Sequence, residues 1–172
     1  DIDETALAEE TPTLLALRLA TEKDIKIADR WDNSLIIGSD QVALLCPKDG
    51  SAEKVLGKPG DFATAQQQLL QCSGQSVIYR TACCLLNSAT NQHQTFYDDY
   101  VLHFNQLDDA QISDYLNKEQ PYDCAGAIKS EGLGVALIKR YEGDDPSTLI
   151  GLPLIKLIAA LNKENYFVLK NQ

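Results

Sequence analysis

Residues 35–45, Leu-Ile-Ile-Gly-Ser-Asp-Gln-Val-Ala-Leu-Leu, decide the fold because a polar tetrad interrupts two apolar runs. The first run, Leu35-Ile36-Ile37, is short and rich in β-branched residues, which is typical of a strand buried on both faces. The tetrad Gly38-Ser39-Asp40-Gln41 predicts a turn at the end of that strand. Buried polar groups are costly unless they are used or satisfied, so the tetrad is a candidate site.

A helix is expected before this segment. Thr11 is a good N-cap, Pro12 suits the first helical turn, and residues from Thr13 to about Asp29 carry leucines at four-residue spacing. Lys23 continues this apolar stripe, so we expect its side chain to project from the core-facing side of the helix.

The rest of the chain alternates predicted helices with predicted strands, which indicates an α/β protein, or an α+β protein with a mixed sheet. The predicted elements are a hairpin tip at residues 47–51, a helix from Asp61 to Gly74, strands at 77–86 and 95–104 that form a long antiparallel hairpin, a helix from Asp108, a strand over 134–141 and a last helix opened by Gly151-Leu152-Pro153.

The composition limits the classes of function. The 172 residues fit one domain, and the net charge of −10 argues against a nucleic-acid-binding surface. A small phosphorylated ligand, held by a few lysines and a divalent cation, remains compatible with that charge. No membrane span or signal peptide is visible, so a cytoplasmic protein is expected. The five cysteines are odd in number and lack a Cys-x-x-Cys spacing, which favours free thiols over a zinc site.

Several side chains have the chemistry of an active site, and each has a simpler explanation. Asp40 is able to hold a metal ion or take a proton from water, or only to cap a turn. Lys58, between Gly57 and Pro59, suits a phosphate oxygen, although such turns are common on surfaces. Lys23 can reach a ligand, or can lay its stem on apolar surface. Glu4 belongs to an acidic terminal stretch that is able to bind a metal or is only solvated.

Glu131 lies in the polar segment Lys129-Ser130-Glu131-Gly132, where a carboxylate is able to accept hydrogen bonds from a base. A Walker-type phosphate loop, a Gly-x-Gly-x-x-Gly motif and the glycine pattern of a nucleophile elbow are all missing from the sequence.

Six segments in the same order resemble the Maf family, and the match runs nearly the whole chain. They are Asp3-Glu4-Thr5, Leu19-Ala20 with Glu22-Lys23, Ile37-Gly38-Ser39-Asp40-Gln41, Gly57-Lys58-Pro59, Cys124-Ala125-Gly126 with Lys129-Ser130-Glu131-Gly132, and Gly143-Asp144-Asp145-Pro146 through Ile150-Gly151-Leu152-Pro153-Leu154.

The resemblance implies a mixed, twisted sheet flanked by helices, usually in a homodimer. It also implies hydrolysis of a nucleoside triphosphate to monophosphate and pyrophosphate with a divalent metal, Mg²⁺ or Mn²⁺. Asp40 matches the family's general base, and Glu4, Lys23 and Lys58 match residues that are important for activity. Glu4 and Asp40 are the implied metal ligands. This chemistry needs cations against the charge on the departing pyrophosphate and a carboxylate for the water.

Ser-Asp-Gln at 39–41 and Lys-Ser-Glu at 129–131 are similar to the branch of the family that prefers 7-methyl-GTP. The dTTP/UTP branch typically has Thr at the position of Gln41. An amide at Gln41 and a carboxylate at Glu131 suit a guanine edge, and a carboxylate favours the cationic methylated base. The alternatives are a dTTP/UTP pyrophosphatase, a non-catalytic regulator of septum formation, and a fragment that binds nucleotide without turnover.

The start of the chain departs from the family pattern. The family begins with a strand and an Ala-Ser-x-Ser-Pro-x-Arg loop, whereas this chain opens on Asp1 and contains no methionine. We therefore expect residues 1–172 to be a single, N-terminally truncated Maf-like domain that is poorly active.

Overall fold

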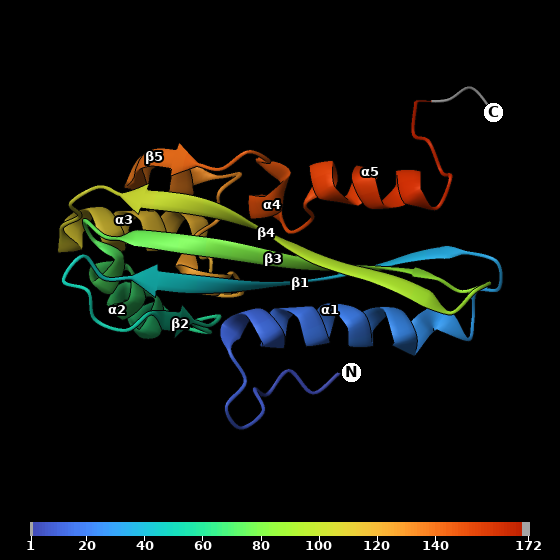
Figure 1. The fold of residues 1–172 in the computed structure, drawn as a ribbon. Coiled ribbons are helices and arrows are strands. Elements are labelled where there is room, and N and C mark those ends of the chain that lie inside the picture. Colours follow the sequence, from blue (N-terminus) through green and yellow to red (C-terminus); the bar gives the residue numbers. More distant parts are fainter. Residues whose placement is uncertain (1, 170–172) are drawn as a thin grey trace. The chain divides into compact units, whose positions relative to one another are not determined.

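The computed structural model describes residues 2–169, which fall into two compact units. Unit 1 comprises Asp1–Gln41, Arg80–Asp99 and Asp145–Gln172, and unit 2 comprises Val42–Tyr79 and Tyr100–Asp144. Five strands form one sheet in the order β2-β1-β3-β4-β5 (Figure 1), and β1, β3 and β4 contribute residues to both units.

Helices and strands are interspersed along the described part of the chain. They are α1 (Pro12–Ala28), β1 (Leu35–Cys46), β2 (Lys54–Leu56), α2 (Phe62–Cys72), β3 (Ser76–Asn87), β4 (Gln92–Phe104), α3 (Asp109–Glu119), the 3₁₀ helices η1 (Ala125–Ala127) and η2 (Leu133–Leu137), β5 (Ile138–Glu142), α4 (Ser147–Ile150) and α5 (Leu154–Lys163).

Strand β1 runs without a break through residues 38–41, so the predicted turn is wrong. The polar side chains of this stretch find partners while the backbone stays extended. Ser39 Oγ lies within hydrogen-bond distance of two carbonyl oxygens, that of Ala82 at 2.9 Å and that of Gly151 at 2.6 Å, and its one proton serves them. A buried polar group that is hydrogen-bonded in this way does not interrupt a strand. The expected burial on both faces also fails at Ile37, whose side chain is 43% exposed.

In unit 1, the two faces of β1 meet different helices, because successive side chains of a strand point in opposite directions. Gly38 lies against Ala20 and Asp24 of α1. Leu35 packs on the other face, against a cluster of Cys83 and Leu85 with Leu157, Ala160 and Leu161 of α5. Figure 1 shows α1 and α5 on opposite sides of the strands, as this alternation requires.

The helix starts of the sequence analysis are confirmed. The side chain of Thr11 accepts a hydrogen bond from Leu14 N at the start of α1, and Asp61 and Asp108 cap α2 and α3 in the same way. The short helix α4 was not predicted. Within residues 2–169 no helix is long and apolar enough to cross a membrane, and no disulfide joins the cysteines of that range, of which Cys72, Cys83 and Cys84 are buried.

In unit 2 the predicted strand over 134–141 begins late. Residues 133–137 form η2, because the amides of Gly132 and Gly134 both donate to Lys129 O and curl the backbone. A Cβ on Gly134 would stand 2.5 Å from that oxygen, so glycine permits the close approach.

The α/β class, with a sheet flanked by helices, is confirmed, and the sheet itself is antiparallel. β1 pairs antiparallel with β2, with Ala43 opposite Leu56, and β4 pairs antiparallel with β5, with Leu102 opposite Tyr141. The predicted hairpin joins β3 to β4, and adjacent strands in Figure 1 run in opposite directions. The mixed strand directions that the resemblance implied are therefore not found among these five strands.

Gly38→Ala should destabilise the protein by about 2 to 3 kcal/mol, because the new methyl group would overpack the contact between α1 and β1. The added Cβ would lie 1.8 Å from Asp24 Oδ1 and 2.2 Å from the Ala20 backbone oxygen, and the backbone cannot swing aside. Urea unfolding measures the change. Gly57→Ala is the control, since its Cβ meets nothing within 4 Å. A G38A midpoint equal to that of G57A would contradict the expected overpacking.

Candidate active site

Three of the predicted site residues meet in unit 1 around one ammonium group. Lys23 Nζ, from α1, lies 2.5 Å from Asp40 Oδ1 on β1 and 3.6 Å from Glu4 Oε1 in the N-terminal segment. The side chain of Asp40 is only 12% exposed, whereas Glu4 lies at the surface. The prediction that Lys23 projects from the inner side of its helix is confirmed by its contact with Asp40.

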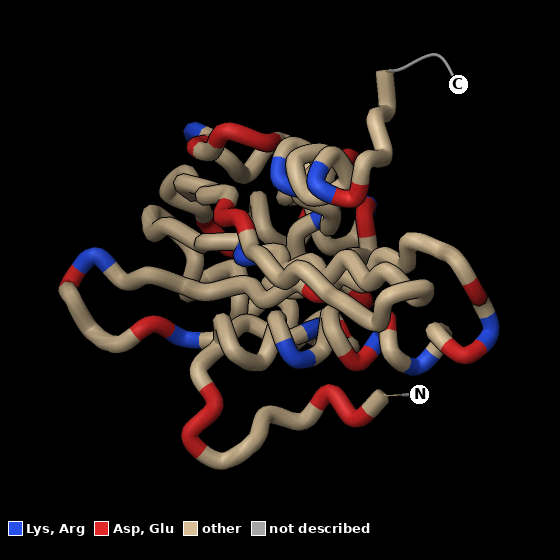
Figure 2. Tube along the Cα trace, turned by 45° about the vertical axis from the view of Figure 1, so that its right-hand side comes forward, with Lys and Arg blue, Asp and Glu red and all other residues tan. Residues whose placement is uncertain are grey.

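A cavity of about 700 Å³ opens beside this cluster. Its lining includes Glu4 and Lys23, together with Ile2 and Lys26. Lys26 was missed from the sequence, although its three-residue spacing from Lys23 places both side chains on one side of α1. Figure 2 shows the acidic positions of the N-terminal segment running beside basic positions of α1. The cavity therefore presents both signs of charge.

The carboxylates of this cluster suit a particular kind of metal site. Among residues 2–169 no group of three or more His, Cys, Asp and Glu side chains could hold a metal ion. The carboxylates of Glu4 and Asp40 lie near each other because both contact Lys23 Nζ. Mg²⁺ is commonly bound by one or two carboxylates, with water and substrate phosphates completing its octahedron. The two carboxylates fit such an ion and do not form an all-protein cage.

Gln41 faces the other side of β1 from Asp40. Its Nε2 carries two protons and lies within hydrogen-bond distance of three oxygens, Thr81 Oγ1 at 2.8 Å and the carbonyl oxygens of Thr148 at 3.0 Å and Leu149 at 3.2 Å. These bonds tie β1 to β3 and α4. The amide group is thus held by protein oxygens, and its role in choosing a base remains a prediction.

Lys58 and Glu131 belong to unit 2, while the other four predicted residues belong to unit 1. Lys58 is exposed in the segment between β2 and α2. Glu131 is exposed and accepts a hydrogen bond from Ser130 Oγ at 2.7 Å. Glu119 holds the loop around Glu131 through Lys129 Nζ at 2.9 Å and Leu133 N at 2.8 Å.

Asp24 is a buried acid that the sequence analysis missed. Its side chain is fully buried, and neither carboxylate oxygen has a partner of ordinary hydrogen-bond geometry among the described residues. Burial raises the pKa of Asp24 from 3.8 to about 6, and the thiol of Cys84 lowers it slightly as a weak donor. A signal was present, since Asp24 follows the small residues Ala16 and Ala20 at four-residue spacing on the buried stripe.

In this antiparallel α/β fold a lysine shared by two carboxylates lies beside a cavity, and its ammonium suits an anionic ligand. The chain belongs to the Maf family, because the family model described as Maf-like protein matches residues 1–164.

Curated relatives support the same assignment. The chain is 45% identical to a 7-methyl-GTP pyrophosphatase of Colwellia psychrerythraea, over all of this chain and 83% of the relative. It is 50% identical to one of Alcanivorax borkumensis, over 95% of this chain and 80% of the relative. A relative of the same name from Nitrosococcus oceani is 46% identical over 98% of this chain and 82% of its own length.

Asp24 should make stability depend on pH. Because its pKa is higher in the folded protein than in the unfolded chain, its contribution to stability is fully present below about pH 4 and is lost as the pH rises through about 6. Asp24→Asn removes this titration. From about pH 4 to pH 7 the wild type should lose on the order of 2 to 3 kcal/mol relative to the variant.

Urea unfolding at several pH values measures this difference. Asp32→Asn, at an exposed position, is the control and should follow the wild type throughout. Parallel curves for the wild type and D24N would show that Asp24 does not titrate in this range.

Proposed function

We propose that this protein is a nucleoside triphosphate pyrophosphatase that hydrolyses 7-methyl-GTP to its monophosphate and pyrophosphate. The observation that carries the proposal is the ion pair of Lys23 with Asp40, joined by Glu4 at the edge of a cavity. The relatives named 7-methyl-GTP pyrophosphatase, at 45–50% identity over most of the chain, support the choice of reaction and of nucleotide.

Asp40 is the proposed general base. A carboxylate within reach of the attacking water orients it and accepts its proton as the water approaches the α-phosphorus. The ammonium of Lys23 fixes the direction of the Asp40 side chain through the 2.5 Å contact. The same ammonium can donate to a phosphate oxygen as negative charge moves onto the departing pyrophosphate. Lys58 is proposed, from the family pattern, as a further phosphate contact.

Glu4 and Asp40 are the proposed ligands of a divalent cation, Mg²⁺ or Mn²⁺. When bound, such a cation neutralises phosphate charge and helps to align the triphosphate. The proposal is supported by the two carboxylates that lie around Lys23, since hard oxygen ligands are what these ions prefer.

Base choice is assigned to Gln41 and Glu131 on the family pattern. A methylated guanine is cationic, so a carboxylate favours it over unmodified guanine. The hydrogen bonds of Gln41 to Thr81 and Thr148 support an indirect part for this amide, in which it fixes the backbone next to Asp40. A homodimer in the cytoplasm, with no nucleic-acid partner, completes the proposal.

Asp40→Asn should lower kcat for 7-methyl-GTP by about a thousandfold, because the amide cannot accept the proton of the water. Pyrophosphate release from a panel of 7-methyl-GTP, GTP, dTTP and UTP measures both the rate and the preference. Asp49→Asn, in an exposed turn, is the matched control and should retain the wild-type rate.

Two outcomes would contradict the proposal. Faster hydrolysis of dTTP or UTP than of 7-methyl-GTP would move the protein to the other branch of the family. A D40N variant with the wild-type rate would remove Asp40 from the mechanism. All comparisons use the same chain, so they do not depend on its absolute rate.

Glu131→Gln should reduce the preference for 7-methyl-GTP over GTP by about tenfold, because it removes the charge that attracts the cationic base. The ratio of kcat/KM for the two nucleotides measures the preference. Glu53→Gln, another exposed acid of unit 2, is the control. An unchanged ratio in E131Q would exclude Glu131 from base recognition.

A further inference from the structure

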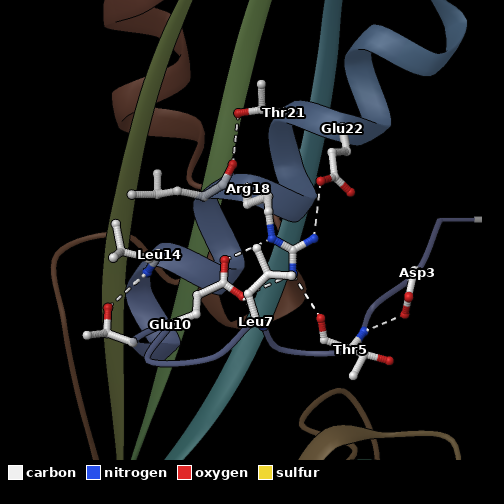
Figure 3. Close-up of polar contacts among 10 residues, drawn as sticks. Asp3, Thr5, Leu7, Glu10, Leu14, Arg18, Thr21 and Glu22 are labelled. Atoms are coloured by element: carbon white, nitrogen blue, oxygen red, sulfur yellow. Dashed lines mark hydrogen bonds and ion pairs between the residues drawn. The ribbon is translucent and has the colours of Figure 1, made fainter.

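The segment that carries Glu4 has no regular secondary structure. Residues 2–11 form neither helix nor strand before α1 begins at Pro12. A segment without helix or sheet hydrogen bonds pays the full entropy of ordering and needs other contacts to hold its place. Figure 3 shows where these contacts come from, with the guanidinium of Arg18 at their centre.

Arg18 grips the segment at two points. Its Nε donates to Glu10 Oε1 at 2.8 Å and its Nη2 to Glu10 Oε2 at 3.0 Å, which makes a bidentate pair. Nη2 also donates to the carbonyl oxygen of Thr5 at 3.0 Å. The side chain of Glu10 is only 8% exposed, and ion pairs of this planar, sheltered kind are stronger than ordinary surface pairs.

Glu10 also holds the residues that precede it in the chain. Its Oε2 accepts a hydrogen bond from Leu7 N at 3.0 Å, and the Thr5 amide donates to Asp3 Oδ1 at 2.9 Å. Hydrogen bonding to the guanidinium is also the first cause that lowers the pKa of Glu10 below its ordinary value. The segment is therefore fixed directly on the C-terminal side of Glu4.

Arg18 and Lys23 stand on the same helix, five residues and about 7.5 Å of helix rise apart. Arg18 holds the backbone carbonyl of Thr5. Lys23 Nζ lies 3.6 Å from Oε1 of Glu4, the residue that precedes Thr5. Because α1 is rigid, the distance between these two points is fixed. Glu4 is then brought to Asp40 by the helix that also carries Lys23.

We propose that the Arg18–Glu10 pair is a brace that positions Glu4 beside Asp40 for cation binding. Arg18 is thus a positioning residue, which acts through the backbone of Thr5 and not by contact with the nucleotide. The inference rests on the proposed function where it gives Glu4 a divalent cation to bind.

Glu22 supplies a matched control. It also pairs with Arg18, at 3.1 Å one turn further along α1, but its side chain is 40% exposed. Its hydrogen bond with Arg18 stays within the helix and leaves the N-terminal segment untouched. Removing Glu22 therefore tests the charge environment of Arg18 without releasing the brace.

The test measures Mn²⁺ binding by electron paramagnetic resonance, with the metal alone and no nucleotide. Arg18→Gln should weaken Mn²⁺ binding about tenfold, since it removes a sheltered charge-assisted pair. Arg18→Lys should fall between R18Q and the wild type, because an ammonium keeps the charge but loses the fork. E22Q should match the wild type. Hydrogen exchange at the amides of Thr5 and Leu7 should speed up in R18Q alone.

A double variant separates positioning from general stability. If Arg18 acts through Glu4, E4Q/R18Q binds Mn²⁺ no more weakly than E4Q, whereas an independent effect would add to that of E4Q. Additive effects, unchanged exchange at residues 3–10 in R18Q, or a wild type that binds no Mn²⁺ would each overturn the brace. Neither readout needs turnover, so a protein that passes these tests and hydrolyses no triphosphate would overturn the proposed function alone.

Discussion

The close approach of α1 to β1 at Gly38 is the contact on which the rest of unit 1 depends. With no side chain at this position, the Ala20 carbonyl and the Asp24 carboxyl can lie directly over the strand. Lys23 precedes Asp24 on the helix, and Asp40 follows Gly38 by two residues on the same face of β1. The contact that buries Asp24 therefore also sets the 2.5 Å separation between Lys23 and Asp40. A longer distance between α1 and Gly38 would also lengthen the distance between Lys23 and Asp40, since helix and strand are both stiff over a few residues.

This contact explains why a costly buried acid is tolerated. Burial without a strong hydrogen-bond donor disfavours the charged form of a carboxyl, and Asp24 therefore has a raised pKa. A leucine at position 24 would avoid that cost but would need more room than the strand leaves at Gly38. The small carboxyl fills the space that glycine opens, next to the thiol of Cys84.

The sequence predicted the helix starts of this fold, and it missed the long-range contacts of residues 38–41. The N-caps Thr11, Asp61 and Asp108 were found because their signals are local hydrogen bonds written into a few adjacent residues. The tetrad at residues 38–41 was misassigned as a turn because its partners lie far along the chain. Ser39 is satisfied by Gly151 and Gln41 by Thr148, and no local pattern announces such bonds. Because side chains alternate along β1, Asp40 and Gln41 point to opposite faces of the strand, although they are neighbours in the sequence.

Arg18 was invisible for a related reason. On a helix wheel Arg18 is one more basic side chain on the exposed side beside Glu22, and such surface ion pairs contribute little to stability. The importance of Arg18 comes from its hydrogen bonds to Glu10 and Thr5. These residues lie in a segment whose sequence has no helical or strand periodicity. Only the folded chain shows that the Arg18–Glu10 pair is sheltered and that Arg18 also binds the residue next to Glu4.

The charges around the cavity supply the physical argument for the proposed cation. The chain carries a net charge of −10, which repels a polyanion at long range. The described residues of the cluster are Lys23 and Lys26 against Glu4 and Asp40, two charges of each sign, so they cancel. Lys23 is moreover already paired with Asp40, and a phosphate must compete with that carboxylate for its protons. A divalent cation that enters with the triphosphate relieves both difficulties, because it neutralises the phosphates and gives the carboxylates a second positive partner.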